Sequence, residues 1–341
     1  MNRLIDELMQ QPAYLRSLVE DYQGSNRIQA LCSNVLPHHW TLTGMGASFH
    51  AACIGSYYLN SLGISAIACE AADLVNYHRP VAQDPSWVVY VSQSGSSGEI
   101  TPFLESFPQN HSLVSVTNNP ASELARKARW LLPMDAGEET LIASKTYINS
   151  LAILWLLARQ VAGKWDGSEF NQLLNIANRI EGALAQAGAT ADRMVKTLAD
   201  CHPLLFLGHG PHGVTARHAA MVMSEWVKLP TLHAGIGAFR HGFIETIQPG
   251  YGVVIFAAPG QASASALDLA AELSRYGAQV LLIENGRLRQ PDEPPACEPA
   301  VDEFLSPILD IIPLQLYAEG LAKHRQIEPG FRYISKVVQR L

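Results

Sequence analysis

Two tandem α/β domains, each a doubly wound parallel sheet with helices on both faces, are predicted from three features of this sequence. The chain has 341 residues, which is more than one hydrophobic core usually holds. Apolar residues make up 48% of the chain and charged residues 16%, so two large cores can be filled. The third feature is an internal repeat, in which strand, glycine-containing turn and helix recur in both halves.

The repeat is visible in the order and spacing of its parts. The first half contains TLTGMGASFHAACIGSYYL, SWVVYVSQSGSSGEITPFLESF and HSLVSVTNN, and the second contains LLFLGHGPHGVTARHAAMVMSEWV, YGVVIFAAPGQASASALDLAAEL and AQVLLIEN. Gly95 follows Gly44 by 51 residues, and Gly260 follows Gly208 by 52. The matching spacing indicates two copies of one fold.

Four short apolar runs are predicted to be central strands. They are Trp87–Val91, Leu113–Val116, Val253–Ala257 and Val280–Ile283. Apart from Ser115, these runs are continuously apolar rather than alternating, which is typical of strands buried on both faces. Strands that alternate with helices form parallel sheets through crossover connections.

The chain is expected to divide into five segments. They are a leading helix over 1–24, a first α/β domain over 25–165, a connecting helix pair over 166–194, a second α/β domain over 195–325 and a C-terminal tail over 326–341. The leading and connecting segments have apolar residues three to four apart, which is helical spacing. Residues 290–303 are rich in proline and acid and are predicted to be an exposed loop.

Composition excludes several classes of protein. The net charge is −7 and no run of Lys or Arg occurs, so nucleic acid is not an expected partner. The sequence shows no secretory signal and no apolar run long enough to span a bilayer, so neither a membrane segment nor export is expected. Five scattered cysteines without a CxxC pair suit reduced thiols in the cytoplasm. The spacing of His209, His212 and His218 matches no known ligand set, so no metal is expected.

Two glycine- and serine-rich turns in the first half are candidate ligand sites. They are Gly44–Ser48 and Ser92–Gly98, and each follows a predicted strand. Ligands bind open parallel sheets at the carboxyl ends of strands, where backbone N–H groups and hydroxyls suit a phosphate. Such a turn taken alone is more often a helix cap than a site, but two in one domain favour a site. The second half has lost most of these hydroxyls, so we expect it not to bind phosphate in this way.

Nucleotide cofactors are not expected. The first turn lacks GxGxxG because Phe49 stands where the third glycine would be, and no GxxxxGK[ST] occurs. No acid is clearly placed to bind a ribose, and no GxSxG elbow for serine hydrolysis is present.

Five motifs in order resemble those of the sugar isomerase (SIS) family, whose domain occurs twice in the isomerase part of glucosamine-6-phosphate synthase. The resemblance covers about residues 25–341. The motifs are GMGASFHAA, SQSGSSGE, EETLIASKTYINSL, EWVKLPTLHAGIGAFRHGFIE and PGFRYISKVVQRL. The resemblance implies two flavodoxin-like domains and a phosphosugar ligand.

The resemblance also implies roles for individual residues. The phosphate would be held by Ser48, Ser92, Gln93, Ser94 and Ser97. The rest of the sugar would be contacted by Gly46, Ala143, Ser144 and Lys145. Glu225 would move a proton between C1 and C2, and His241 would assist ring opening. Lys336 would contact the open-chain sugar or form a Schiff base with it.

Departures from the synthase pattern narrow the expected activity. The synthase carries a lysine three residues before its catalytic glutamate, and this chain has Val222 there. The chain is too short to include a glutamine-hydrolysing domain, and residue 2 is Asn rather than a nucleophilic Cys. These differences favour the standalone double-SIS proteins, which are fructosamine-6-phosphate deglycases and aminosugar-phosphate isomerases or deaminases.

We therefore expect a cytoplasmic enzyme that needs no cofactor, because proton transfer beside a carbonyl requires only an acid/base group and charge stabilisation. The family implies a homodimer, or a dimer of dimers, with the site at the subunit interface. The alternative is a sensor that binds a sugar phosphate without consuming it, and turnover distinguishes the two.

Overall fold

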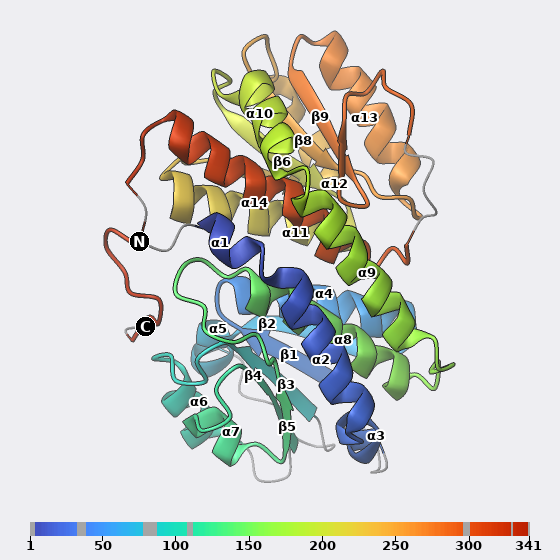
Figure 1. Cartoon of the computed structure of the whole chain (residues 1–341), viewed down its shortest axis with the longest axis vertical. Coiled ribbons are helices and arrows are strands. Elements are labelled where there is room, and N and C mark those ends of the chain that lie inside the picture. The colour runs from blue at the N-terminus through green and yellow to red at the C-terminus, as the bar shows by residue number, and fades with distance from the viewer. Residues whose placement is uncertain are drawn as a thin grey trace. The chain divides into compact units, whose positions relative to one another are not determined.

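The computed structural model describes residues 4–32, 39–77, 87–107, 112–295, 301–328 and 330–339. The chain divides into two compact units, each with one five-stranded sheet (Figure 1). We call Gln10–Ala177 with Arg332–Leu341 the first-sheet unit, and Met1–Met9 with Asn178–Phe331 the second-sheet unit.

The sheet of the first-sheet unit is parallel throughout, in the order β2-β1-β3-β4-β5. Its strands are β1 (His39–Gly44), β2 (Ser65–Glu70), β3 (Trp87–Ser92), β4 (Ser112–Thr117) and β5 (Trp130–Pro133). Every residue of β3 is buried, as its continuous apolar run predicts. The expected strands beginning at Trp87 and Leu113 are confirmed as β3 and β4.

Helices connect and cover these strands. They are α2 (Gln11–Gly24), α3 (Arg27–Cys32), α4 (Ala47–Ser61), α5 (Ala71–Asn76), α6 (Ile100–Ser106), α7 (Glu123–Lys127), α8 (Lys145–Val161) and α9 (Glu169–Leu184), which ends within the other unit. Gly55 allows α4 to pack closely, because an added Cβ would lie 2.7 Å from Leu42 on β1 and 3.0 Å from Leu154 on α8.

The sheet of the second-sheet unit has the order β10-β9-β8-β6-β7. Its strands are β6 (Leu204–Gly208), β7 (Leu232–Gly235), β8 (Gly252–Phe256), β9 (Gln279–Glu284) and β10 (Arg287–Arg289). Its helices are α1 (Leu4–Leu8), α10 (Ala187–Leu198), α11 (Gly210–Val222), α12 (Ile236–Arg240), α13 (Ser263–Arg275) and α14 (Ser306–His324), with a π-helical turn η1 (Met223–Val227) and a 3-10 turn η2 (Phe243–Thr246). The two strands expected here are present as β8 and β9.

One edge of this second sheet differs from the expected parallel arrangement. Strand β10 pairs antiparallel with β9, while the other four strands are parallel. Asn285 and Gly286 join the two strands with φ angles of 51° and 79°. Both angles are positive, as a tight hairpin turn requires, and Asn-Gly is the dipeptide that such a turn favours.

Two helices, α1 and α2, occupy the segment expected to form one leading helix. Pro12 lies in the first turn of α2, where a missing N–H and a fixed φ are tolerated, whereas a proline inside a continuous helix would break it. The described parts of the loop predicted over 290–303 contain no helix or strand after Arg289, and residues 296–300 lie outside the described residues.

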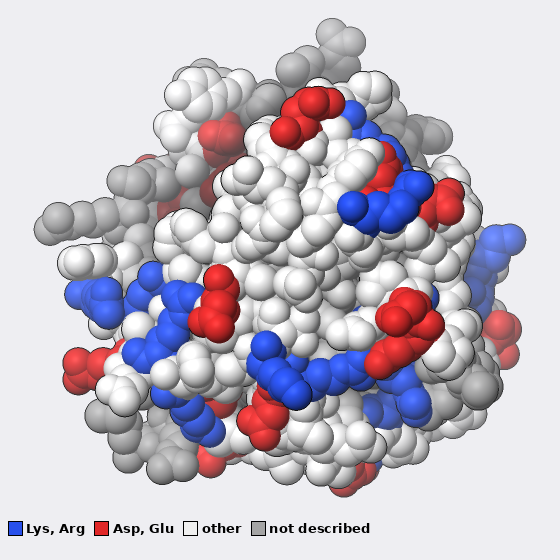
Figure 2. All heavy atoms as spheres, turned by 90° about the horizontal axis from the view of Figure 1, so that it is seen from above, with Lys and Arg blue, Asp and Glu red and all other residues white. Residues whose placement is uncertain are grey.

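Within the described part of the chain, no helix is both long enough and apolar enough to cross a membrane. On the face drawn in Figure 2, acidic and basic side chains lie interspersed among uncharged residues rather than gathered by sign.

Candidate active site

The two serine- and glycine-rich turns meet at one edge of the first sheet. The first follows β1 and the second follows β3, and these two strands are neighbours. A Cβ at Gly44 would lie 2.7 Å from the carbonyl oxygen of Val91 and 2.9 Å from the backbone of Ser48. Glycine is therefore required at this position, because it allows the two turns to approach each other at the carboxyl ends of their strands.

The turn Ser92–Gly98 is held in a compact loop by its own hydroxyls. Ser92 Oγ accepts the N–H of Gly95 at 3.1 Å, and Ser94 Oγ accepts the N–H of Ser96 at 3.3 Å. The carbonyl of Gln93 accepts the N–H of Asn118 at 3.1 Å. Because a hydroxyl also has one hydrogen to donate, Ser92 and Ser94 can each donate to a ligand oxygen while they hold the loop.

The remaining phosphate candidates lie near this loop in different surroundings. Ser48 is half-buried in the first turn of α4, and Gly46 precedes that helix with φ 52°. The Ser97 hydroxyl donates to the carboxylate of Glu99, which is buried. Ser97 must therefore leave Glu99 before it can donate to a phosphate.

Replacing Gly95 by Ala should collapse this loop. Gly95 has φ 61°, and an added Cβ would lie 2.1 Å from the Oγ of Ser122, which caps α7. We expect Gly95→Ala to lower the free energy of unfolding by more than about 2 kcal/mol, since both the left-handed backbone and the cap suffer.

Gly63→Ala is the matched control for this prediction. Gly63 also has a positive φ, of 81°, but nothing lies within 4 Å of its added Cβ. Urea unfolding of both variants checks the prediction, and equal destabilisation of the two would contradict it.

A buried carboxylate organises the segment that precedes α8. Glu139 Oε1 accepts the backbone N–H groups of Ser144 and Thr146 at 2.8 and 3.1 Å, and the Ser144 hydroxyl at 3.2 Å. Glu139 Oε2 accepts the Thr146 hydroxyl at 2.6 Å and the ammonium of Lys336 at 3.0 Å. The carboxylate thus occupies the N-terminus of α8, where an anion is favourable.

The electrostatics of Glu139 follow from these contacts. Burial by itself would raise the pKa of this carboxyl, but the Lys336 ammonium, the Thr146 hydroxyl and the two backbone N–H groups outweigh burial. The pKa of Glu139 is consequently lowered, and the group is a carboxylate at neutral pH.

The candidate sugar contacts in this segment already have partners within the protein. Ser144 is fully buried against Glu139. The ammonium of Lys145 donates to Gln10 Oε1 at 2.7 Å and to the carbonyl of Glu138 at 2.6 Å. Ala143 is half-buried and is the most open of the three. Contact of these residues with sugar remains a prediction.

The C-terminal tail lies against the same loop and the same carboxylate. Besides Glu139, the Lys336 ammonium contacts the carbonyl of Leu141. The carbonyl of Val338 accepts the N–H of Gly98 at 3.0 Å, and Gln339 donates to the carbonyl of Ser96 at 3.3 Å. The structure therefore gathers Lys336, Glu139 and the serine-rich loop in the first-sheet unit.

Glu139 is the residue of this group to which the sequence analysis gave no role. The available signal was an acidic residue shortly before a Ser-Lys-Thr helix start, a pattern in which the carboxylate can cap the exposed N–H groups.

Glu225 and His241 lie in the second-sheet unit. Glu225 is half-buried in η1, the π-helical turn that continues α11, and such turns are frequent at functional sites. Its neighbour Trp226 is buried and donates to Glu319 on α14 at 3.0 Å, which fixes the turn. The Val222 side chain is fully buried, so this position belongs to the core. His241 is exposed just after α12.

The three histidines considered as metal ligands, His209, His212 and His218, have different surroundings. Burial lowers the pKa of His212 to about 4 and that of His218 to about 3, so both are neutral residues of the interior. His209 contacts the Ser265 hydroxyl at 3.2 Å. Across the described ranges, no three His, Cys, Asp or Glu side chains are grouped so that they could hold a metal ion.

Comparisons with known proteins agree with this architecture. Residues 37–159 match the model of the SIS domain. Glutamine–fructose-6-phosphate aminotransferase (isomerizing) from Oceanobacillus iheyensis is 25% identical over 336 residues, which cover 95% of this chain and 56% of that protein. The enzyme of the same name from Shouchella clausii is 27% identical over 333 residues, covering 94% and 55%. The chain thus spans about half the length of these curated relatives.

Solved structures resemble this one over nearly the whole chain. The C-terminal domain of glucosamine-fructose-6-phosphate aminotransferase from Francisella tularensis superposes with a TM-score of 0.85 at 20% identity, covering 97% of this chain and 98% of that one. Glucosamine-6-phosphate deaminase from Thermotoga maritima superposes with a TM-score of 0.80 at 20% identity, covering 99% of each. These likenesses confirm the predicted fold of two tandem α/β sheets. The chain resembles the SIS-domain family through the match over residues 37–159.

Proposed function

We propose that the protein is a phosphosugar isomerase-type enzyme that acts on an aminosugar phosphate or a fructosamine 6-phosphate as an isomerase, deaminase or deglycase. The observation that carries this proposal is the pair of serine- and glycine-rich turns that meet at the carboxyl ends of β1 and β3. Their geometry suits a phosphate, and the relatives that are named for an activity are named for sugar phosphates.

In this proposal the first-sheet unit binds the substrate. The hydroxyls of Ser48, Ser92 and Ser94, with the loop backbone, hold the phosphate, and Gln93 and Ser97 complete the contact. Lys336 lies beside this loop with its ammonium paired to Glu139. An ion-paired ammonium donates hydrogen bonds rather than attacking a carbonyl, so we assign Lys336 to a sugar oxygen and not to an imine.

Glu225 supplies the chemistry. It takes a proton from one of C1 and C2 and returns it to the other, so the substrate passes through an enediol or enolamine without net oxidation. Glu225 is half-buried in η1, a position that leaves its carboxyl open to a substrate as a general base requires. His241, exposed at the end of α12, assists ring opening, in this proposal across the interface of a homodimer.

The core position of Val222 favours removal or rearrangement of an amine over its transfer. The related synthase pattern has a lysine here, and a buried valine cannot replace its charge. The amine is therefore expected to enter or leave with the sugar phosphate itself.

Turnover of defined substrates tests the proposal. The purified protein is incubated with fructose 6-phosphate, with glucosamine 6-phosphate, and with fructosamine 6-phosphates of several amino acids, and products are followed by mass. We expect one class to be consumed, and Glu225→Gln to lower kcat at least about a hundredfold while binding persists, because only proton transfer is removed. Glu105→Gln, on the exposed side of α6, is the matched control and should behave as wild type.

The outcomes separate the enzyme from the sensor. Binding without turnover by the wild-type protein across the panel would overturn the enzyme proposal and favour a sensor. Turnover that survives Glu225→Gln would remove Glu225 from its assigned role.

A further inference from the structure

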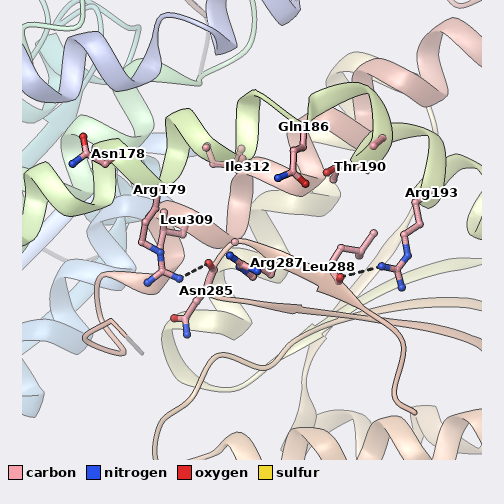
Figure 3. Close-up of a pocket in the computed structure, with 14 residues that line it drawn as sticks. Asn178, Arg179, Gln186, Thr190, Arg193, Asn285, Arg287, Leu288, Leu309 and Ile312 are labelled. Atoms are coloured by element: carbon pink, nitrogen blue, oxygen red, sulfur yellow. Dashed lines mark hydrogen bonds between the residues drawn. The ribbon is translucent and has the colours of Figure 1, made fainter. Parts of the chain in front are cut away.

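A pocket of about 600 Å³ in the second-sheet unit lies among the bend between α9 and α10, the β9–β10 turn and helix α14 (Figure 3). Two arginines of its lining have partners within the protein. Arg179 donates to the carbonyl of Asn285 at 3.2 Å (Figure 3). Arg193 donates to the carbonyl of Leu288 at 3.3 Å and forms an ion pair with Glu293. These two side chains therefore hold the β9–β10 turn, and their charge does not point to a ligand.

A buried hydroxyl in the first-sheet unit, by contrast, lacks a partner. Tyr90 on β3 is fully buried, and its hydroxyl makes no hydrogen bond with the described residues. The ring is held by an edge contact with Phe103 on α6, with the ring centroids 4.9 Å apart. A buried hydroxyl that has lost water without gaining a partner is unfavourable, so such groups are rare in folded proteins.

The carboxylate of Glu99 lies near this hydroxyl. Burial raises the pKa of Tyr90, and the charge and acceptor oxygens of Glu99 raise it further. The two side chains are thus neighbours, although the hydrogen bond between them does not close in this structure. Glu99 immediately precedes α6, is itself buried, and accepts the hydroxyl of Ser97. The carboxylate therefore has two hydroxyls beside it and is bonded to that of Ser97.

A phosphate would compete with Glu99 for the Ser97 hydroxyl. Ser97 has one hydrogen to donate, so it cannot donate to the carboxylate and to a phosphate at once. When Ser97 turns to a phosphate, the buried carboxylate loses a hydrogen bond, which is costly for a charged group. Donation from Tyr90 to Glu99 would satisfy the carboxylate and the tyrosine hydroxyl together.

The backbone of the loop allows this change through side-chain rotation alone. The carbonyl of Ser97 accepts the N–H of Ile100 at 3.0 Å. The carbonyl of Glu99 accepts the N–H of Phe103, also at 3.0 Å. Neither bond involves a side chain, so both are kept while the Ser97 and Glu99 side chains turn.

We propose that Glu99 and Tyr90 are positioning residues that release Ser97 to the phosphate of the substrate. As Ser97 turns from Glu99 to the phosphate, Glu99 turns to the hydroxyl of Tyr90. This inference rests on the proposed function, because it takes Ser97 as a phosphate ligand. Every proton stays on its own oxygen, and the exchange ends with one more hydrogen bond than it began with. Tyr90 thereby adds to the affinity for a phosphosugar without touching it.

Tyr90→Phe tests this exchange, because it removes the hydroxyl and keeps the ring. The probes for calorimetry are inorganic phosphate and sorbitol 6-phosphate, which has no carbonyl and cannot be isomerised. We expect the variant to bind both about tenfold more weakly, the effect of one hydrogen bond to a charged group. Its midpoint of urea unfolding should equal that of wild type, because the hydroxyl makes no hydrogen bond with the described residues.

Tyr317→Phe is the matched control. Tyr317 lies on α14 in the second-sheet unit, is fully buried, and has a hydroxyl without a hydrogen-bond partner in the described part of the chain. This variant should bind both probes as wild type does. A purely structural role of a buried tyrosine hydroxyl would not distinguish the two variants.

The Ser97→Ala background separates the exchange from any other effect of Tyr90. With no hydroxyl at position 97, Glu99 has nothing to release, so adding Tyr90→Phe should leave the affinity for either probe unchanged. Wild-type affinity in Tyr90→Phe, or an equal loss in both backgrounds, would overturn the exchange and leave the phosphate site intact. No binding of either probe to the wild-type protein at millimolar concentration would overturn the phosphate site, and the exchange with it.

Discussion

Glu139→Ala is expected to lower the free energy of unfolding by about 3–5 kcal/mol, the range for removing one partner of a buried ion pair. The substitution leaves the backbone N–H groups of Ser144 and Thr146 without their acceptor, and these groups are buried. It also leaves the ammonium of Lys336 without its counter-charge. Chemical denaturation at pH 7 measures the loss.

The neighbouring Glu138→Ala provides a close control. The Glu138 side chain is exposed, and the carbonyl that accepts Lys145 is retained by alanine. We expect a change within about 0.5 kcal/mol for this variant, as for most surface substitutions. Similar losses in the two variants would mean that the contacts of Glu139 contribute little.

The ion pair of Glu139 with Lys336 also predicts how the free energy of unfolding changes in acid. The folded-state pKa of Glu139 is lowered, so its contribution to stability is present above the unfolded value of about 4.3 and is lost as the pH falls through the lower folded value. The stability difference between wild type and Glu139→Ala should therefore shrink on acidification below about pH 4.

The tail of the protein depends on the same carboxylate. Lys336 joins Glu139, and two hydrogen bonds join the tail to the loop after β3, so the C-terminal residues share one network with the proposed phosphate site. Loss of Glu139 should therefore weaken phosphosugar binding as well as folding. In the proposed function, Glu139 would act on the site through Lys336.

The local pattern of apolar residues was sufficient to predict the parts of the fold that are repeated and deeply buried. The apolar runs beginning at Trp87 and Val253 identified strands β3 and β8, because burial on both faces leaves no polar positions. The antiparallel β10 was missed although the Asn285-Gly286 dipeptide marks a hairpin. Its short strand, Arg287–Arg289, carries no apolar run.

The site was predictable only where its residues are contiguous. The Ser92–Gly98 loop follows a recognisable strand, but Glu139 gains its role from Lys336, which lies 197 positions away in the chain. The pocket of the second-sheet unit is even harder to predict from sequence, since its lining residues Arg179, Arg287 and Leu309 come from three separate elements. No local spacing encodes such a meeting, which depends on the packing of helices onto the second sheet.

Asp310 links that pocket to the interior of the second-sheet unit. Its side chain is fully buried, and Oδ1 accepts the N–H of Gly286 in the β9–β10 turn at 2.7 Å. Its Oδ2 lies 3.5 Å from Nδ1 of His212. Burial raises the pKa of Asp310 to about 8 and lowers that of His212 to about 4, so both groups are neutral at pH 7.

The sign of the pH dependence follows from these values. The unfolded Asp310 loses its proton near pH 3.9, whereas the folded one keeps it until about pH 8, so unfolding releases a proton in between. Stability contributed by Asp310 therefore falls as the pH rises through this window. The contribution of His212 to stability increases as the pH rises from about 4 to 6.5, which opposes the decrease caused by Asp310. The decrease is therefore most visible above pH 6.5.

Asp310→Asn should remove this dependence, because asparagine still accepts the Gly286 N–H but does not titrate. Between pH 6.5 and 8 the free energy of unfolding of wild type should fall relative to that of Asp310→Asn by about 2 kcal/mol, at about 1.4 kcal/mol per pH unit. Urea unfolding at intervals across this range measures the difference. Asp268→Asn, exposed on α13, should run parallel to wild type. A wild-type stability that stays parallel to that of Asp310→Asn over this range would instead indicate that Asp310 is already ionised in the folded protein.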